Sequence, residues 1–166
     1  QDWWVKASKK VVPYVNITAQ LDTVPDQKLL AEKGGRGFPY VTLMTASGIV
    51  VWEFWPADAE AFDKAFAMAT KLNSLMEKSM ASPEDKGLAA SVKILDNMGR
   101  SQRQPSADAD ELKALAATEG VDAKVLEMYK ADLKEKAAMK VFMDAFSKAR
   151  TDGGIAVLEL FKAGTK

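Results

Sequence analysis

The chain has 166 residues, of which 28% are charged, with 23 lysines and arginines, 23 aspartates and glutamates, and no cysteine or histidine. This length suffices for one ordinary domain or two small ones, and the balanced, mixed charge argues against nucleic acid as a partner. The missing thiols and imidazoles exclude disulfides, thiol nucleophiles and histidine acid–base catalysis, and leave almost no transition-metal ligands. We therefore expect no catalytic, metal-binding or cofactor-binding residues, and no enzymatic activity from this chain.

The sequence contains no run of about 18 apolar residues, so we expect no transmembrane segment. Its first residue is Gln1 rather than methionine, as in a mature protein after removal of a signal peptide, a proteolytic product or a shortened chain. On this ground we expect a periplasmic or secreted protein, with the cytoplasm as the alternative.

The first third of the chain has the pattern of a small sheet with one short helix. Residues 11–19 are rich in β-branched and aromatic side chains and are predicted to form a strand. Residues 26–33 form a predicted short helix, which Gly34 ends in the left-handed conformation. The segments 41–44 and 49–54 are predicted to pair as an antiparallel hairpin.

After the hairpin, Ala, Lys, Leu, Met and Glu dominate with helical spacing. Asp58 is the expected N-cap of a helix that runs to about Met80. Residues 82–85 combine a cap, a first-turn proline and two acids, so a second helix should run to about Met98. The polar stretch 99–105 has no periodicity and is typical of a linker.

Three more elements are predicted in the rest of the chain. Asp108, with a glutamate three residues later, has the capping-box pattern for a helix that ends at Gly120. Asp122 caps the longest predicted helix, which extends to about Arg150. The run 155–161 is expected to form a last short helix, although its apolar residues would also suit a strand. The apolar stripe predicted for the longest helix comprises Val125, Tyr129, Leu133, Ala137, Met139, Val141, Phe142 and Phe146.

The loop Gly-Gly-Arg-Gly-Phe-Pro-Tyr at 34–40, followed by the hairpin and a helix, carries a resemblance to a known family. With the predicted strand and short helix before it, this order resembles the second half of a thioredoxin-like domain, whose Gly-x-Pro loop holds a cis-proline. The resemblance covers about residues 3–80. It implies an α/β (α+β) fold: an incomplete thioredoxin-like sheet with flanking helices in a domain at 1–80, and an all-helical extension at 81–166.

The Cys-x-x-Cys motif of that family is absent here. By the resemblance, the first strand–helix–strand unit is absent too, and residues 3–8 are the remnant of the helix that carries the cysteines. The strand then missing would lie between 11–19 and 41–44, and an unpaired buried strand edge invites pairing with another chain. Three arrangements remain open: the flanking strands pair directly, another polypeptide inserts a strand, or an upstream piece of the same protein supplies it.

Five residues are candidates for partner contact. The resemblance implies that Phe38, Pro39 and Tyr40 form the surface that contacts the substrate backbone in the family, and this loop could still bind an extended peptide. The alternative is that the proline only shapes the turn into the hairpin. Trp3 and Trp4 are adjacent, so they cannot both face one side of an element, and we expect at least one to be exposed or to meet a partner.

Together these patterns predict a redox-inactive, non-catalytic thioredoxin-like protein that serves as a binding or structural subunit of a larger assembly. Its partner would be another protein or a second copy of the chain. The alternative function is that of a thiol–disulfide oxidoreductase or redox accessory whose dithiol lies on an upstream segment or on a partner chain.

Overall fold

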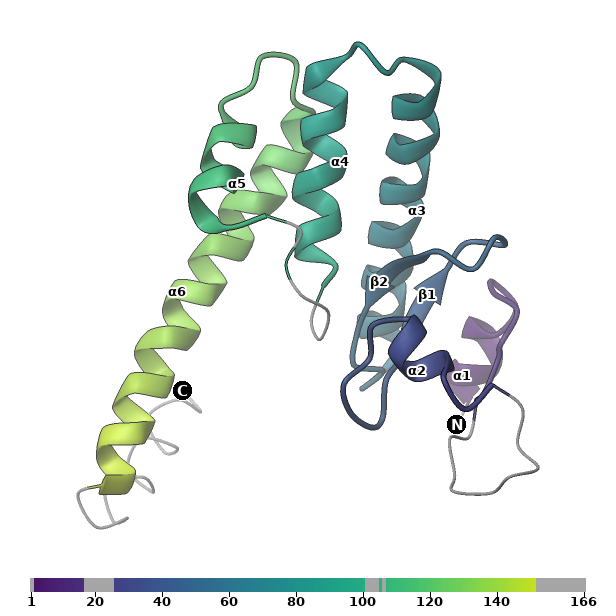
Figure 1. Cartoon of the computed structure of the whole chain (residues 1–166). Helices are drawn as coiled ribbons and strands as arrows, with labels where there is room; N and C mark the ends of the chain where they lie inside the picture. The colour runs from purple at the N-terminus through teal and green to yellow at the C-terminus, as the bar shows by residue number, and fades with distance from the viewer. Residues whose placement is uncertain (1, 17–25, 101–104, 106, 152–166) are drawn as a thin grey trace. The chain divides into compact units, whose positions relative to one another are not determined.

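The computed structural model describes residues 2–16, 26–100, 105 and 107–151. The fold is mixed but dominated by helix, which makes up 60% of it, with one small two-stranded antiparallel sheet and flanking helices (Figure 1). The elements are α1 (Asp2–Ala7), α2 (Leu29–Glu32), β1 (Thr42–Met44), β2 (Val50–Glu53), α3 (Ala59–Ala81), α4 (Lys86–Met98), α5 (Ala109–Ala116) and α6 (Ala123–Thr151).

The chain divides into two compact units, residues 1–126 and residues 127–166. The boundary expected near residue 80 falls in the last turn of α3, and α3 packs against α4 within the first unit. None of the helices in the described ranges is both long enough and apolar enough to cross a bilayer.

The expected hairpin is confirmed as β1 and β2. Its turn is closed by the Gly48 N–H, which donates to the Thr45 carbonyl at 3.0 Å, and by the Ile49 N–H, which donates to the Thr45 hydroxyl at 3.1 Å. Gly48 has a φ of 80°, a conformation that glycine adopts without steric cost. The register pairs Thr42 with Glu53, Leu43 with Trp52 and Met44 with Val50, and it shifts between Leu43 and Met44.

Helix α3 supplies the core that covers the hairpin. It begins after Asp58, whose carboxylate accepts a hydrogen bond from the Ala61 N–H at 2.8 Å, so the expected N-cap is confirmed. Val50 and Val51 of β2 are buried, and α3 contacts both strands. The buried side chains of α3 recur every three or four residues, at Phe62, Ala65, Ala69, Leu72 and Leu75.

The expected helix after residue 85 is confirmed as α4, which packs against α3 and α5. Within the stretch 82–85 the capping residue is Asp85, whose carboxylate accepts from the Leu88 N–H at 2.9 Å. Asp108 caps α5 by accepting from two backbone N–H groups, as the capping-box pattern predicts for the first residue of the box. Helix α5 ends at Ala116, before the predicted stop at Gly120, which has a φ of 83°.

Asp122 ties the first turn of α6 to α3 and α4. One carboxylate oxygen accepts from the Val125 N–H at 2.9 Å, and the other accepts from the Lys71 ammonium at 3.0 Å. The Asp122 N–H donates to the Ser91 hydroxyl at 2.9 Å, and that hydroxyl donates to the Gly87 carbonyl at 2.7 Å. The predicted N-cap of the longest helix is therefore also a junction between three helices.

This junction predicts a pH dependence of stability. Burial by itself would raise the pKa of Asp122, but the Val125 N–H, the hydrogen bond and charge of Lys71, and the Lys124 N–H together hold that pKa below its ordinary value of 3.8. A carboxyl group whose pKa is lower in the folded chain contributes stability above the unfolded pKa and loses it as the pH falls through the folded pKa. We expect this contribution to disappear as the pH falls through and below 3.8.

Asp122→Asn keeps an oxygen that can cap the helix but removes the negative charge. We expect it to lower the free energy of unfolding at pH 7 by about 0.5–1 kcal/mol and to flatten the decline of stability in acid. Urea unfolding at pH 7 and at pH 3 measures both effects. If the free energy of unfolding fell by the same amount between pH 7 and pH 3 in Asp122→Asn and in the unchanged chain, the result would contradict the role of the Asp122 charge.

Three sequence expectations are corrected by the structure. Residues 12–16 of the predicted strand 11–19 have no regular secondary structure, and 17–19 lie outside the described residues. Pro13 has no N–H to donate to a ladder, and Val12 is 94% exposed, so this run is not a buried central strand. The helix expected at 26–33 is limited to α2, although Gly34 follows it with the predicted positive φ, 85°.

The third correction concerns the apolar stripe of α6. The helix itself is confirmed, and Val125 and Tyr129 are buried as predicted. Leu133, Met139 and Val141, which were expected in the core, are exposed. The last predicted element, 155–161, and most of the predicted linker 99–105 lie outside the described residues.

Candidate interaction site

The loop from Gly34 to Tyr40 leads from α2 into the hairpin, and its Phe38–Pro39 peptide bond is cis. A Cβ atom at Gly35 would lie 2.4 Å from Leu30 Cδ1 and 2.8 Å from Tyr40 Cδ1, so any other residue there would require these side chains to shift. Phe38 is 68% exposed and Pro39 is exposed as well. This part of the loop therefore faces solvent.

Tyr40 is directed into the protein. It is half-buried, and its hydroxyl lies 2.9 Å from the Lys33 carbonyl oxygen and 3.2 Å from Glu53 Oε1, so these two acceptors share its one proton. Of the three loop residues predicted to meet a partner, Tyr40 thus fixes the loop to β2, while Phe38 and Pro39 present the free surface.

The two adjacent tryptophans lie on α1, and the expected helix at this position is confirmed. Their rings meet edge to face with centroids 5.3 Å apart, and Trp4 also meets Phe62 edge to face at 6.3 Å. Trp3 is half-buried, whereas Trp4 is 46% exposed. One tryptophan of the pair therefore faces solvent, as their adjacency requires.

Phe62 is the centre of an aromatic cluster that joins α1, the end of the hairpin and α3. Its ring lies 6.1 Å from that of Phe54 and 6.0 Å from that of Phe66, in addition to its contact with Trp4. Phe62 is only 2% exposed. The cluster holds α1 against α3, and with it the chain that follows α1.

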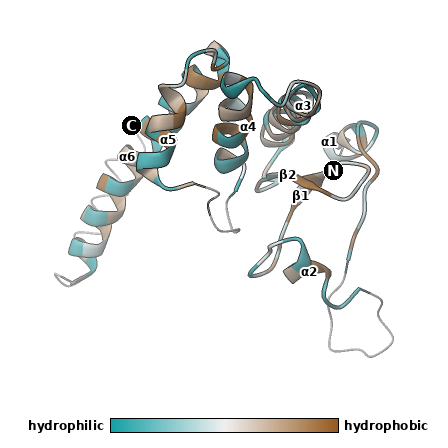
Figure 2. Cartoon of the chain, turned by 45° about the horizontal axis from the view of Figure 1, so that its top comes forward, coloured by the Kyte–Doolittle hydropathy of each residue, from teal (hydrophilic) through white to brown (hydrophobic). Residues whose placement is uncertain are grey.

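A groove of about 470 Å³ lies between that chain segment, residues 11–15, and β1. The segment runs on the β1 side of the hairpin in both views, and Figure 2 shows hydrophobic colouring on both (Figures 1 and 2). The two walls and the α3 side of the groove are mostly apolar, as in Val11, Tyr14, Val15, Leu43, Met44 and Phe66. Trp4 also lines the groove, whereas Phe38, Pro39 and Tyr40 do not.

Within the described ranges, the groove has one charged lining residue, Lys10. Its ammonium lies 2.7 Å from the Asp63 carboxylate and 5.9 Å from the centroid of the Phe66 ring. A second pocket of about 570 Å³ shares Leu43 and Met44 with the groove and extends along α3. The apolar surface beside β1 is thus continuous over two adjoining hollows.

The outer edge of β1 faces this groove. In an antiparallel pair, alternate residues direct their backbone groups toward the partner strand and away from it. The Phe54 N–H donates to the Val41 carbonyl at 3.2 Å, which places Val41 and Leu43 on the β2 side. Thr42 and Met44 therefore direct their N–H and C=O groups away from β2, and within the described ranges the sheet has no third strand to receive them.

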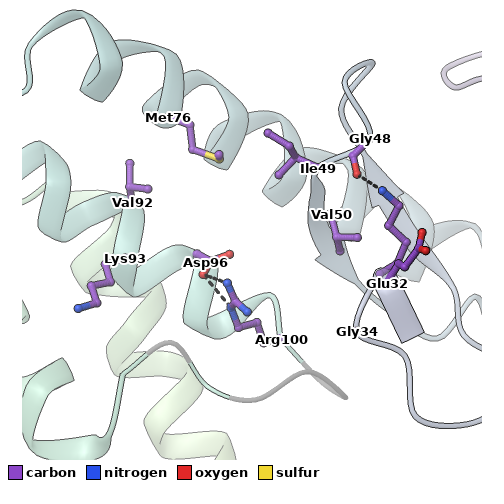
Figure 3. A pocket seen from close by; sticks show the side chains of 11 residues that line it. Glu32, Gly34, Gly48, Ile49, Val50, Met76, Val92, Lys93, Asp96 and Arg100 are labelled. Carbon is purple, nitrogen blue, oxygen red and sulfur yellow. Dashed lines mark hydrogen bonds and ion pairs between the residues drawn. The ribbon is translucent and has the colours of Figure 1, made fainter. Parts of the chain in front are cut away.

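Another pocket, of about 530 Å³, lies between α2, the hairpin, α3 and α4 (Figure 3). Its cations have partners: the Lys33 ammonium donates to the Gly48 carbonyl at 2.7 Å, and Arg100 Nε donates to Asp96 at 2.7 Å. Lys93, the third cation, pairs with Glu111. Because carboxylates neutralise Arg100 and Lys93 and a backbone carbonyl engages the Lys33 ammonium, the pocket does not have the character of an anion-binding site.

The sequence indicated part of this site and missed the rest. Trp4 was a predicted partner residue and lies in the groove, but the wall formed by 11–15 was expected to be a buried strand. Pro13 was the available signal against that strand.

The hydroxyl of Tyr14 hydrogen-bonds to Asp26 at 3.0 Å, and this bond is the main cause that raises the pKa of Tyr14.

Among the described residues, no group of three or more aspartates and glutamates is placed to hold a metal ion. Comparison of the chain with protein-family models, curated proteins and solved structures finds no match.

Proposed function

We propose that this chain is a non-catalytic, thioredoxin-like binding or structural subunit of a larger protein assembly. The observation that carries the proposal is the outer edge of β1, whose backbone groups face an apolar groove and have no ladder partner among the described residues. Unpaired strand edges are the places where sheets accept another chain. Such an edge beside apolar side chains provides both hydrogen bonds and buried area for a protein partner.

The resemblance to the thioredoxin-like family supports the same proposal. Of the order on which the resemblance depends, the loop 34–40, the hairpin of β1 and β2 and the long helix α3 are present, whereas residues 12–16 of the strand predicted before them are not a strand. The chain has no cysteine, so this half of the fold would serve as a binding surface rather than a redox centre. Exposed aromatic side chains at Phe38 and Trp4 are of the kind that anchors protein interfaces.

Native mass spectrometry of the untagged chain, purified from its source, tests the proposal. We expect a complex whose mass exceeds that of the chain. Trp4→Ala should raise the dissociation constant of that complex by about tenfold, because a buried aromatic anchor would be lost. Far-ultraviolet circular dichroism should remain unchanged.

Trp55→Ala is the matched control, because Trp55 is 64% exposed but does not line the groove. It should leave the complex intact. A chain that stays monomeric at its natural concentration would overturn the proposed function. If Trp4→Ala and Trp55→Ala weakened the complex equally, the result would contradict the placement of Trp4 in the interface.

A further inference from the structure

We infer that the groove between residues 11–15 and β1 binds an extended, uncharged segment of the partner protein as an added β-strand. The segment pairs with the backbone groups of Thr42 and Met44. This inference rests on the proposed function and deepens it, because it assigns both the docking site and the chemistry of the part of the partner that occupies it.

Backbone geometry gives the first argument. Thr42 and Met44 direct donors and acceptors toward the groove, two residues apart, as the pairing edge of a strand does. An incoming strand satisfies both residues without rearranging the hairpin, since Val41 and Leu43 already bond to β2. Backbone pairing at a sheet edge is an established way to capture an extended peptide.

The groove walls give the second argument. An added strand would lie between β1 and residues 11–15, with Trp4 and Phe66 among the side chains beside it. Within the lining stretch 41–46, β1 itself spans Thr42–Met44, about 10 Å at about 3.3 Å per residue, so the central residues of a segment of five or six would lie along it. Its side chains would bury apolar surface that the chain leaves open, notably Val12 and Val15.

The charges of the groove lining indicate which kind of segment the groove binds. Among the described residues, Lys10 is the one charged residue of the lining, and Asp63 already pairs with it. A charged side chain in the middle of the incoming segment would lose its hydration and find no opposite charge, which is costly. The occupant is therefore uncharged along its centre and rich in β-branched or aromatic residues, and it contains no proline where its N–H must pair.

Selecting displayed seven-residue peptides for binding to the immobilised full chain tests this inference. The selected segments should be apolar and uncharged at their centres. Met44→Pro removes the N–H that faces the groove, and proline is tolerated at a strand edge where the N–H points outward. We expect Met44→Pro to weaken binding about tenfold and Met44→Ala, which keeps the N–H, to weaken it less than about threefold.

A pair of methylated peptides provides a second test that leaves the protein unchanged, should Met44→Pro fail to fold. The best selected segment is made with N-methyl groups on its odd residues or on its even residues. Since only alternate N–H groups of an added strand face β1, one version should bind about tenfold more weakly than the other. Equal affinity of the two versions would overturn strand addition.

Other results also contradict the inference. Segments selected for central charges, binding that Met44→Pro leaves unchanged, or no selected segment at all would each exclude an uncharged added strand. Self-association of the chain that Met44→Pro abolishes would identify a second copy as the occupant instead. If the native complex persists in Met44→Pro, the inference fails while the proposed function stands, and if no native complex exists, the proposed function fails by itself.

Discussion

Phe62→Ala is expected to lower the free energy of unfolding by about 3–5 kcal/mol. The side chain is 2% exposed and contacts the rings of Trp4, Phe54 and Phe66. Its removal costs the burial of a phenyl group and leaves a cavity where α1, the hairpin end and α3 meet. Urea unfolding followed by tryptophan fluorescence measures the change, and Trp4 reports directly on the damaged cluster.

Phe62→Leu is the control for volume. Leucine fills much of the space, so we expect a loss of less than about half that of Phe62→Ala. Equal losses for the two variants would mean that the ring contacts, rather than the filled volume, dominate the cluster. A loss below about 1 kcal/mol for Phe62→Ala would show that the cluster is not part of the cooperative core.

Gly87→Ala is expected to destabilise the chain by about 2–3 kcal/mol. A Cβ atom at Gly87 would lie 2.3 Å from the carbonyl carbon of Gly120 and 2.6 Å from the Glu119 carbonyl oxygen. Both are backbone atoms and cannot rotate away, so α4 would have to move from the loop before α6. That movement would also stretch the hydrogen bond from Ser91 to Gly87 and disturb the Asp122 junction.

The sign of this effect makes the prediction stringent, because replacing glycine by alanine inside a helix ordinarily stabilises by about 0.5–1 kcal/mol. Gly37→Ala is the matched control. A Cβ atom there meets no atom within 4 Å, so we expect a change within about 0.5 kcal/mol. A stabilised Gly87→Ala protein, measured by thermal and urea unfolding, would contradict the close packing of α4 on Gly120.

Features with short-range causes could be predicted from the sequence. Asp58 and Asp122 mark helix starts because a carboxylate three residues before a free N–H caps it wherever the helix packs. Gly48 marks the hairpin turn because few other residues adopt its φ without cost. In each case the decisive contact lies within four residues along the chain, so the local sequence contains all the information.

Features that depend on distant contacts could not be predicted in this way. The run 11–16 has strand-forming side chains, but a strand also needs a ladder of hydrogen bonds, and within the described residues the sheet consists of β1 and β2 alone. Leu133 and Val141 have helical spacing, yet spacing does not say whether another element covers them. Likewise, no local signal distinguishes Gly87, which touches Gly120, from an ordinary helical glycine.

The candidate site also has one part that could be predicted from the local sequence and one part that depends on distant contacts. Trp4 could be identified because two adjacent tryptophans cannot share one face of a helix. The groove could not, because it forms where residues 11–15 lie near β1, about 30 positions later in the sequence.

Site-resolved amide hydrogen exchange, comparing the isolated chain with the chain in its native complex, tests strand addition at β1 most directly. We expect the Thr42 and Met44 amides to exchange at least about tenfold more slowly in the complex, because a partner strand accepts their hydrogen bonds. The Leu43 amide, already paired with β2, should change much less. Unchanged exchange at Thr42 and Met44, with protection elsewhere on the chain, would contradict the assignment of this edge as the binding site.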